Sequence, residues 1–219
     1  MKPKASSDQA IPIRERIFDA AEFLFGEHGY EGASLRDIAD LAKTRMGMVS
    51  YHFQSKEALY EKIVERRASE LGRVRLQLLA TERRSYAPSP IPVSRIIYTY
   101  TWPFLEHSSG KDPGWRSYSR IITSIVNSKK WSHLITNNYD AISDVFISEF
   151  QRSMPSIDRN NIIVGLTFMV NVMQGIAAET GRVDNLSSQT IRSTDTARMF
   201  NIMLPFLSAG FERGLSQTP

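Results

Sequence analysis

The sequence contains no cysteine among its 219 residues. This absence excludes disulfide bonds, cysteine nucleophiles and thiolate metal sites, and it favours a reducing compartment such as the cytoplasm. Catalytic signatures are missing too: there is no His-Glu-x-x-His motif and no glycine-rich phosphate loop, and the four histidines share no metal-ligand spacing. We therefore expect a protein that is not an enzyme and that has no metal site and no cofactor.

Long hydrophobic runs are scarce. The N-terminal MKPKASSDQAIPIR has two lysines but no apolar stretch behind them, so residues 1–12 are expected to form a disordered basic arm rather than a signal peptide. Residues 160–178 are uncharged over 19 positions, close to the ~20 that a membrane helix needs, but several amide side chains interrupt the run. We expect a buried core or interface helix here and no membrane partner.

Alternation of apolar and polar residues is nowhere long enough to predict a sheet, so the expected fold class is all-α. Apolar residues recur at helical spacing over residues 14–28, over the short segments 35–42 and 45–53, and over 55–82. Three prolines within residues 85–92 then forbid a continuing helix and divide the chain. Beyond them, helices are expected at about 93–107, 115–127, 130–153, 158–181 and 192–213.

Acidic residues are absent between Asp40 and Glu57, whereas Lys43, Arg45 and Lys56 lie in this window. The formal net charge is only +4, and it divides evenly into +2 for residues 1–85 and +2 for residues 86–219. Any basic surface must therefore be a local patch. A patch with hydroxyl and aromatic groups suits a phosphate backbone, although a short helical pair with lysines is also compatible with an ordinary solvated corner.

Glycine is missing where a turn would use it. In ADLAKTRMGMVSYHF (residues 39–53), the small residues Ala39 and Ala42 and the later Val49 predict two short helices crossing at a helix-turn-helix. The turn then falls near Lys43, which should cost roughly 1 to 2 kcal/mol relative to glycine if its φ is positive. The alternative that remains is a helical interaction protein without DNA binding.

The segment from Arg14 to Leu71 resembles the DNA-binding domain of the TetR family of bacterial transcriptional regulators. The resemblance rests on AAEFLFGEHGYEGASLRDIA, then YHF, then SKEAL, in the family's order and spacing. It implies a helix-turn-helix DNA-binding domain over residues 13–58, a connecting helix over 55–82, and a ligand-binding and dimerisation domain over 83–219. Such a protein would act as a homodimeric repressor on a near-palindromic operator.

The same resemblance implies two sets of DNA-binding positions. Residues matching positions that grip phosphates are Ser34, Arg36, Tyr51, His52 and Lys56, and residues matching the base-facing positions of the recognition helix are Thr44, Arg45, Met46, Gly47 and Met48. This chain departs from the family at Lys43 to Met46, where relatives commonly have Gly-Val-Ser-Lys, and at Ser50, where an aromatic residue is frequent. We expect these departures to alter the operator sequence, with Arg45 reading a guanine and Lys43 reaching a phosphate.

The C-terminal part is rich in aromatic residues, which at helical spacing form a core more often than a pocket. Asn171 and Gln174 lie within an apolar helix, where a buried amide needs a partner: a ligand, another helix or a dimer mate. The expected ligand-binding residues are Tyr98, Trp102, Tyr118, Phe146, Phe150, Asn171 and Gln174. The ending MLPFLSAGFERG resembles a TetR branch whose members include some that respond to fatty acids or their thioesters. This resemblance implies a small hydrophobic, aromatic or amphiphilic effector, and a four-helix bundle formed across a twofold axis by helices 158–181 and 192–213.

Overall fold

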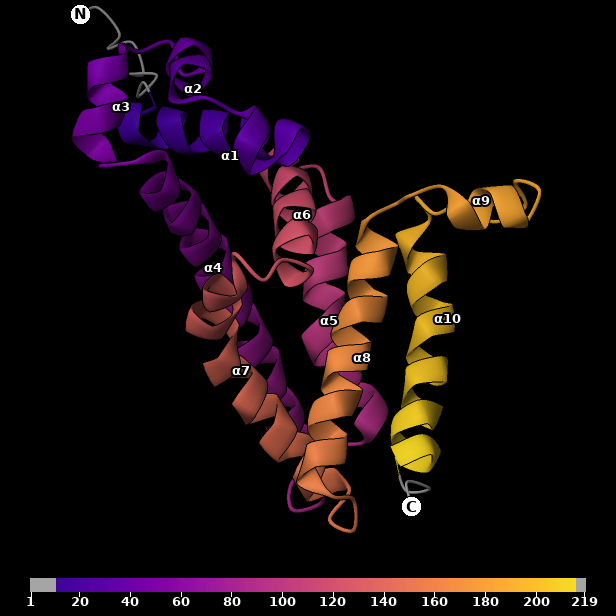
Figure 1. Ribbon diagram of the computed structural model, residues 1–219. Helices are drawn as coiled ribbons and strands as arrows, with labels where there is room; N and C mark the ends of the chain where they lie inside the picture. Colours follow the sequence, from indigo (N-terminus) through magenta and orange to yellow (C-terminus); the bar gives the residue numbers. More distant parts are fainter. Residues whose placement is uncertain (1–10, 216–219) are drawn as a thin grey trace, which may run out of the picture.

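The computed structural model describes residues 11–215, so the arm expected for residues 1–12 lies outside the described residues except for its last two positions. Within this range the secondary structure is helical, without a β-strand, and the predicted all-α fold class is confirmed. Figure 1 shows a small group of helices at one end of a long connecting helix and a larger bundle around the rest of it.

The small group, called here the head, consists of α1 (Ile13–Gly32), α2 (Leu35–Leu41) and α3 (Met46–His52). The long connecting helix α4 (Lys56–Tyr86) leaves the head and runs the length of the molecule (Figure 1). Side-chain caps define two of these starts: Ser34 and Asp37 form a reciprocal capping box at α2, and the Ser55 hydroxyl accepts from the Ala58 N–H at α4.

The larger bundle, called here the body, is built from the remaining helices. They are α5 (Val93–Ser109), α6 (Pro113–Val126), α7 (Ser132–Ser153), α8 (Arg159–Ala177), α9 (Arg182–Leu186), α10 (Thr196–Ala209) and the π-helical turn η1 (Gly210–Gly214). In Figure 1, α8 and α10 run side by side along one flank, and α9 projects away from them.

Three local details differ from the sequence-based expectation. Gly29 does not end the first helix but kinks it, with φ 70° and ψ 174°, before the chain resumes helical structure to Gly32. The eighth helix ends at Ala177, ahead of Glu179 with its φ of 44°. The expected helix over 192–213 starts only at Thr196, where the Asp195 carboxylate accepts from the Arg198 N–H, and the short α9 precedes it.

Helix α8 is long and apolar enough to cross a membrane by length and composition. A core helix of a soluble protein passes the same test. In this structure α8 packs against α5, α7 and α10, so the described fold uses it as a helix of the body.

A buried ion pair joins α1 of the head to the connecting helix α4. Arg67 on α4 donates from Nε and Nη2 to the two carboxylate oxygens of Glu22 on α1, at 2.7 and 2.6 Å, and Glu22 is 1% exposed. Burial by itself lowers the pKa of Arg67, but the hydrogen bond and charge of Glu22 outweigh it and hold this pKa above its ordinary value. Asp112, next to α6, adds a carboxylate 3.5 Å from Arg67.

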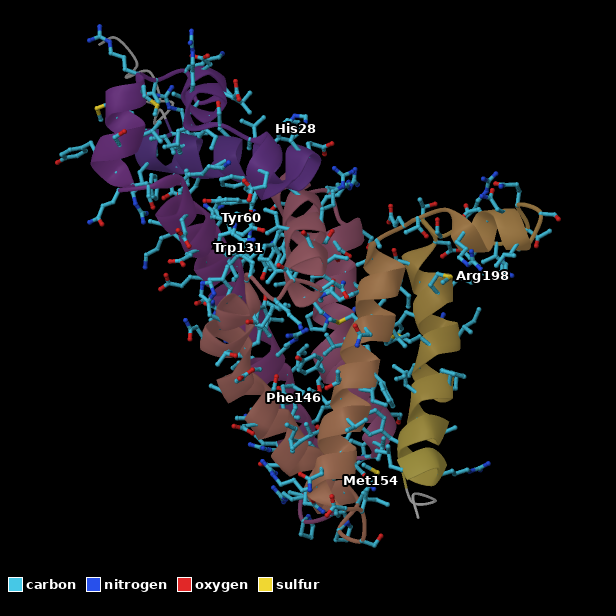
Figure 2. All side chains as sticks on the ribbon, in the orientation of Figure 1. His28, Tyr60, Trp131, Phe146, Met154 and Arg198 are labelled. Atoms are coloured by element: carbon cyan, nitrogen blue, oxygen red, sulfur yellow. The ribbon has the colours of Figure 1, made fainter. Side chains whose placement is uncertain are left out.

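An aromatic cluster packs beside the same joint. Tyr60 on α4 and Trp131, just before α7, lie against each other near the head (Figure 2), with ring centroids 5.0 Å apart. The ring of Tyr30 on α1 is 4.8 Å from that of Trp131. Head and body are therefore held together by both charge and aromatic packing.

Candidate nucleic-acid interface and internal cavity

The turn between α2 and α3 is defined by two backbone hydrogen bonds. The Lys43 N–H donates to the Asp40 carbonyl at 3.1 Å, and the Thr44 N–H donates to the Ala39 carbonyl at 3.0 Å. This pair of bonds is a Schellman motif, which requires a left-handed residue directly after the helix cap. Lys43 is that residue, with φ 51°, so the predicted positive φ at a non-glycine position is confirmed.

The two short helices pack through small and β-branched residues. Ala39 of α2 and Val49 of α3 are both buried, and Phe53 closes the end of α3 with its ring 4.9 Å from that of Phe18 on α1. Because these residues bury one side of α3, its opposite side must face solvent. The predicted crossing of α2 and α3 is present, and Ala39 and Val49, the two residues on which it was predicted, are both buried.

The outer face of α3 carries large side chains that are exposed within residues 11–215. Arg45 precedes the helix as its N-cap residue and is exposed, and so is Met46. Tyr51 is 79% exposed, so it is available to an external partner instead of packing in the core. Gly47 has no atom within 4 Å of the position that a Cβ would occupy.

Three cationic side chains of this region have no partner among residues 11–215. The side chains of Arg36, Lys43 and Arg45 are exposed and form no ion pair or hydrogen bond within that range. A shallow hollow beside the turn brings Lys43 and Arg45 together with Arg16 of α1. The sequence-based prediction did not include Arg16 among the DNA-binding residues. Its position in the first turn of the helix before the helix-turn-helix was the available signal.

The remaining predicted DNA-binding residues differ in exposure. Ser50 is exposed, whereas Thr44, Met48 and His52 are half-buried. Ser34 is exposed, but its hydroxyl already bonds Asp37 within the capping box. Lys56 is not free of packing as the sequence suggested, because its Nζ lies 4.4 Å from the centroid of the Tyr30 ring.

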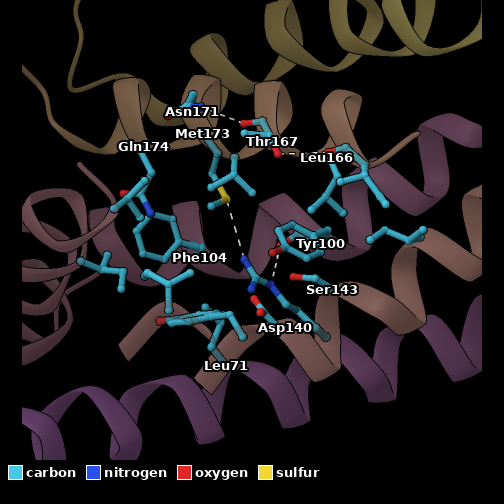
Figure 3. Close-up of a pocket in the computed structure, with 18 of the residues that line it drawn as sticks. Leu71, Tyr100, Phe104, Asp140, Ser143, Leu166, Thr167, Asn171, Met173 and Gln174 are labelled. Atoms are coloured by element: carbon cyan, nitrogen blue, oxygen red, sulfur yellow. Dashed lines mark hydrogen bonds between the residues drawn. The ribbon is translucent and has the colours of Figure 1, made fainter. Parts of the chain in front are cut away.

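The body encloses a cavity of about 410 Å³ between α4, α5, α6, α7 and α8. Figure 3 shows Leu71 and Phe104 on its apolar walls, with Asn171, Met173 and Gln174 entering from α8. This volume falls in the lower part of the ~300–1,000 Å³ range of small-molecule sites.

Only part of the expected ligand-binding set reaches this cavity. Asn171 and Gln174 line it, but Asn171 is exposed and bonds the Thr167 carbonyl of its own helix. Gln174 is buried, and its Oε1 accepts from the Thr123 hydroxyl of α6 at 2.7 Å. A neighbouring helix thus supplies the partner for the buried amide.

The expected aromatic residues are used mainly for packing and do not line the cavity. Tyr98 and Trp102 stack on each other and against Phe200 of α10, while Phe146 packs on Tyr100 and Phe150 on Phe211. Helical spacing does not distinguish these positions from cavity-lining positions on the same helices.

Tyr118 is buried behind the cavity wall and contacts the cavity through another tyrosine. Its hydroxyl is hydrogen-bonded to that of Tyr139, which lines the cavity. Burial raises the pKa of Tyr118 well above its ordinary value, and it raises the pKa of Tyr139 to about 12. Both groups are therefore neutral hydrogen-bonding hydroxyls at physiological pH.

Both parts of the chain match models of known protein families. Residues 17–63 match the family described as bacterial regulatory proteins, tetR family, and residues 98–210 match the tetracyclin repressor-like C-terminal domain. The second match alone covers more than half of the chain. This chain belongs to the TetR family. It is therefore a helix-turn-helix transcription regulator and not an enzyme.

Curated relatives match short segments of this TetR family member. The biofilm operon negative regulator IcaR of Staphylococcus aureus is 40% identical over 53 residues, which are 24% of this chain and 28% of IcaR. The repressor AcnR of Corynebacterium efficiens is 31% identical over 68 residues, or 31% of this chain and 36% of AcnR. The chain thus matches only about a third of the length of each of these relatives.

Solved structures resemble the whole chain. GusR of Salmonella enterica has a TM-score of 0.61 at 17% identity, covering 93% of this chain and 97% of that one. FadR of Bacillus subtilis, solved in complex with stearoyl-CoA, has a TM-score of 0.59 at 14% identity, covering 90% and 98%. At these identities the likeness shows the fold alone.

Proposed function

We propose that this TetR family member is a ligand-responsive repressor that binds a near-palindromic operator as a homodimer. The observation that carries the proposal is the exposed side of α3, beside which Arg36, Lys43 and Arg45 have no partners among the described residues. An unpaired cluster of cations next to an exposed short helix suits a phosphate backbone and a major groove. Residues 13–58 would be the DNA-binding domain and 83–219 the ligand-binding and dimerisation domain, in a cytoplasmic protein.

The side chains suggest a division of labour on DNA. Arg45 is suited to a bidentate contact with a guanine edge, and Met46 or Met48 to contact with a thymine methyl group. Arg36 and Lys43 are suited to phosphates, together with Ser34, Tyr51, His52 and Lys56. In this scheme the Thr44, Gly47 and Ser50 positions lie against the groove.

The apolar flank of α8 and α10 supports dimerisation. Phe168 and Phe206 are 59% and 72% exposed, and Val164 and Ile202 are exposed beside them. No charged residue occurs between Arg159 and Glu179, so most of this flank lacks the charges that keep a surface solvated. A second copy would bury these side chains in a four-helix bundle, with half-sites about one helical turn apart.

The cavity is the proposed effector site. A small hydrophobic, aromatic or amphiphilic ligand that prefers the DNA-incompetent arrangement of the two heads would release the operator. Linkage then requires DNA to weaken ligand binding by the same factor. Equal ligand affinity for free and DNA-bound protein would contradict this switch.

A salt titration on genomic fragments selected by the protein tests the DNA proposal. Affinity should fall steeply with salt, because several phosphates are contacted. Arg36→Ala should weaken all sequences alike and flatten the salt slope, whereas Arg45→Ala should change which sequence binds best, at a cost of about 1 to 3 kcal/mol on the preferred one. Lys111→Ala, which removes an exposed charge from the loop before α6, is the matched control and should change neither.

The alternative function, a helical interaction protein without DNA binding, predicts a different result. Such a protein would select no fragment, and the three variants would be indistinguishable from the wild type at every salt concentration. That outcome would contradict the proposal directly.

A further inference from the structure

The cavity contains a buried charge that no carboxylate of residues 11–215 neutralises. Arg75 of α4 is 2% exposed and lines the cavity, yet it forms no ion pair with any carboxylate of the described residues. A buried charge without a partner is costly, and an anion that pairs with it recovers part of that cost.

The hydrogen bonds of Arg75 leave part of its guanidinium unused. Nε donates to the Tyr100 carbonyl at 2.7 Å, and Nη2 lies 3.8 Å from the Met173 sulfur, a weak acceptor. The dashed lines at Tyr100 and Met173 in Figure 3 mark these two contacts. Nη1 has no hydrogen bond with residues 11–215, but it is not among the polar atoms cut off from solvent, so it faces the cavity.

The orientation of the guanidinium is fixed by its packing. Its central carbon lies 3.8 Å from the centroid of the Tyr100 ring, so the flat group is held against an aromatic face. A guanidinium held this way presents its N–H groups in a plane that matches the two oxygens of a carboxylate. Tyr139 lines the same cavity, and its hydroxyl adds a second hydrogen-bonding group.

The acidic residues that line the cavity do not form an ion pair with Arg75. Asp144 is exposed, and its Oδ1 lies 3.4 Å from Arg159. Asp140, which Figure 3 places close to Ser143, is also exposed and forms no ion pair with Arg75. Because Asp140 is exposed and lines the same cavity, it would compete with a ligand for Arg75.

We propose that the effector is a small organic carboxylate whose anionic end binds Arg75 and Tyr139 and whose apolar body fills the cavity. This inference rests on the proposed role of the cavity as the effector site. The apolar walls, including Leu71, Phe104 and Leu166, would contact the hydrocarbon part of the ligand. A cavity of about 410 Å³ suits a medium-length aliphatic or aryl-alkyl acid.

The test is direct binding to the full-length, DNA-free protein by titration calorimetry. The probes are straight-chain carboxylates from hexanoate to dodecanoate and 4-phenylbutanoate, each compared with the primary alcohol of the same skeleton. Acids that bind should do so at least about tenfold more tightly than their alcohols, as expected for charge-assisted hydrogen bonds. Equal binding of acid and alcohol, or binding by none of the acids, would overturn the proposal.

Four variants locate the anionic end. Arg75→Gln should abolish the preference for acid over alcohol, and Arg75→Lys, which keeps the charge, should retain part of it. Arg73→Gln, an exposed neighbour on α4, is the matched control and should bind like the wild type. Asp140→Asn should bind the acid at least as tightly, whereas loss of acid binding there, or an unchanged preference in Arg75→Gln, would overturn the assignment.

Operator binding without ligand separates this inference from the proposed function. If Arg75→Gln binds operator normally and has lost only its acid preference, both proposals stand. If the wild type binds acids but never releases DNA, the carboxylate site stands and the switch fails.

Discussion

At position 43 a lysine holds a backbone conformation that glycine adopts without steric cost. The unfavourable free energy of this conformation is tolerated because the surrounding structure fixes the chain. The capping box at Ser34 holds the start of α2, and Ala39 is buried where α2 packs on α3. A strained residue retained beside a reading helix suggests that its charge serves DNA binding.

Exchanging Lys43 separates the strain from the charge. Lys43→Gly should raise the free energy of unfolding by about 1 kcal/mol, because glycine removes the left-handed penalty. Lys43→Ala keeps the Cβ and should leave this free energy nearly unchanged. Both variants should weaken operator binding to a similar small extent, because both lose the same cation. Urea unfolding and DNA titration of the two variants measure these effects, and equal stability of both variants would show that the turn is unstrained.

Sequence reasoning found the turn residue but missed the charged residue of the cavity. Lys43 was predictable because its neighbours on both sides fixed the register. Arg75 occupies an apolar stripe position, four residues after Leu71 and four before Leu79, which was a visible sign of a buried arginine. The sequence could not show whether a carboxylate of another helix neutralises it, because that depends on how α4, α5 and α7 pack.

Where α1 packs on α6, Gly26 leaves no room for a larger residue. A Cβ at this position would lie 2.8 Å from the Cα of Ser117, and a backbone atom cannot move aside as a flexible side chain can. Gly47 in α3 is the opposite case, because nothing lies within 4 Å of its Cβ position. Both glycines have helical backbones, so the two positions differ in packing rather than in φ.

The two glycines therefore predict opposite responses to alanine. Gly26→Ala should lower the free energy of unfolding by about 1 to 3 kcal/mol, because overpacking exceeds the gain in helix propensity. Gly47→Ala should raise it by up to about 1 kcal/mol. Urea unfolding curves of the two variants test this pair. A stable Gly26→Ala variant would mean that α1 and α6 separate easily, and the head would then be loosely attached to the body.

The ends of the helices were predictable where adjacent residues carry a clear start or stop signal. The capping serines, the proline linker and the aspartates ahead of α6 and α8 mark starts that depend on adjacent residues. The region from 178 to 195 was less predictable: Gly181 signalled a break, but the left-handed residues Glu179, Ser188 and Gln189 are neither glycine nor proline and gave no such signal. Tyr98 and Trp102 were wrongly expected to line a cavity. Only tertiary packing decides which side of α5 faces α10, and the sequence does not show this packing.

At the scale of the molecule, the cavity lies between α4 and the body helices, and the head contains α3, the helix that we propose reads DNA. Helices α1 and α4 connect the two regions. The buried Arg67–Glu22 pair joins α1 to α4, and the close approach of Gly26 to Ser117 joins α1 to α6. Arg75 lies two helical turns from Arg67 on the same helix α4, so a ligand on Arg75 acts on the helix that carries the head. This arrangement gives the proposed effector a physical connection to the spacing of two heads.

That spacing is defined only if two copies associate through α8 and α10. Phe206→Asp places a charge in the middle of the exposed apolar flank and should convert the dimer to a monomer, because a buried unpaired carboxylate is costly. Leu186→Asp is the matched control, since Leu186 is an equally exposed apolar residue on α9, away from that flank. Light scattering after gel filtration measures the mass of both variants.

The Phe206 variant should also lose most of its affinity for an operator with two half-sites, because joint binding by two linked heads is what raises affinity. It should bind a single half-site as weakly as the wild type does. A Phe206→Asp protein that remains dimeric, or that binds the full operator as tightly as Leu186→Asp, would place the dimer interface elsewhere on the body.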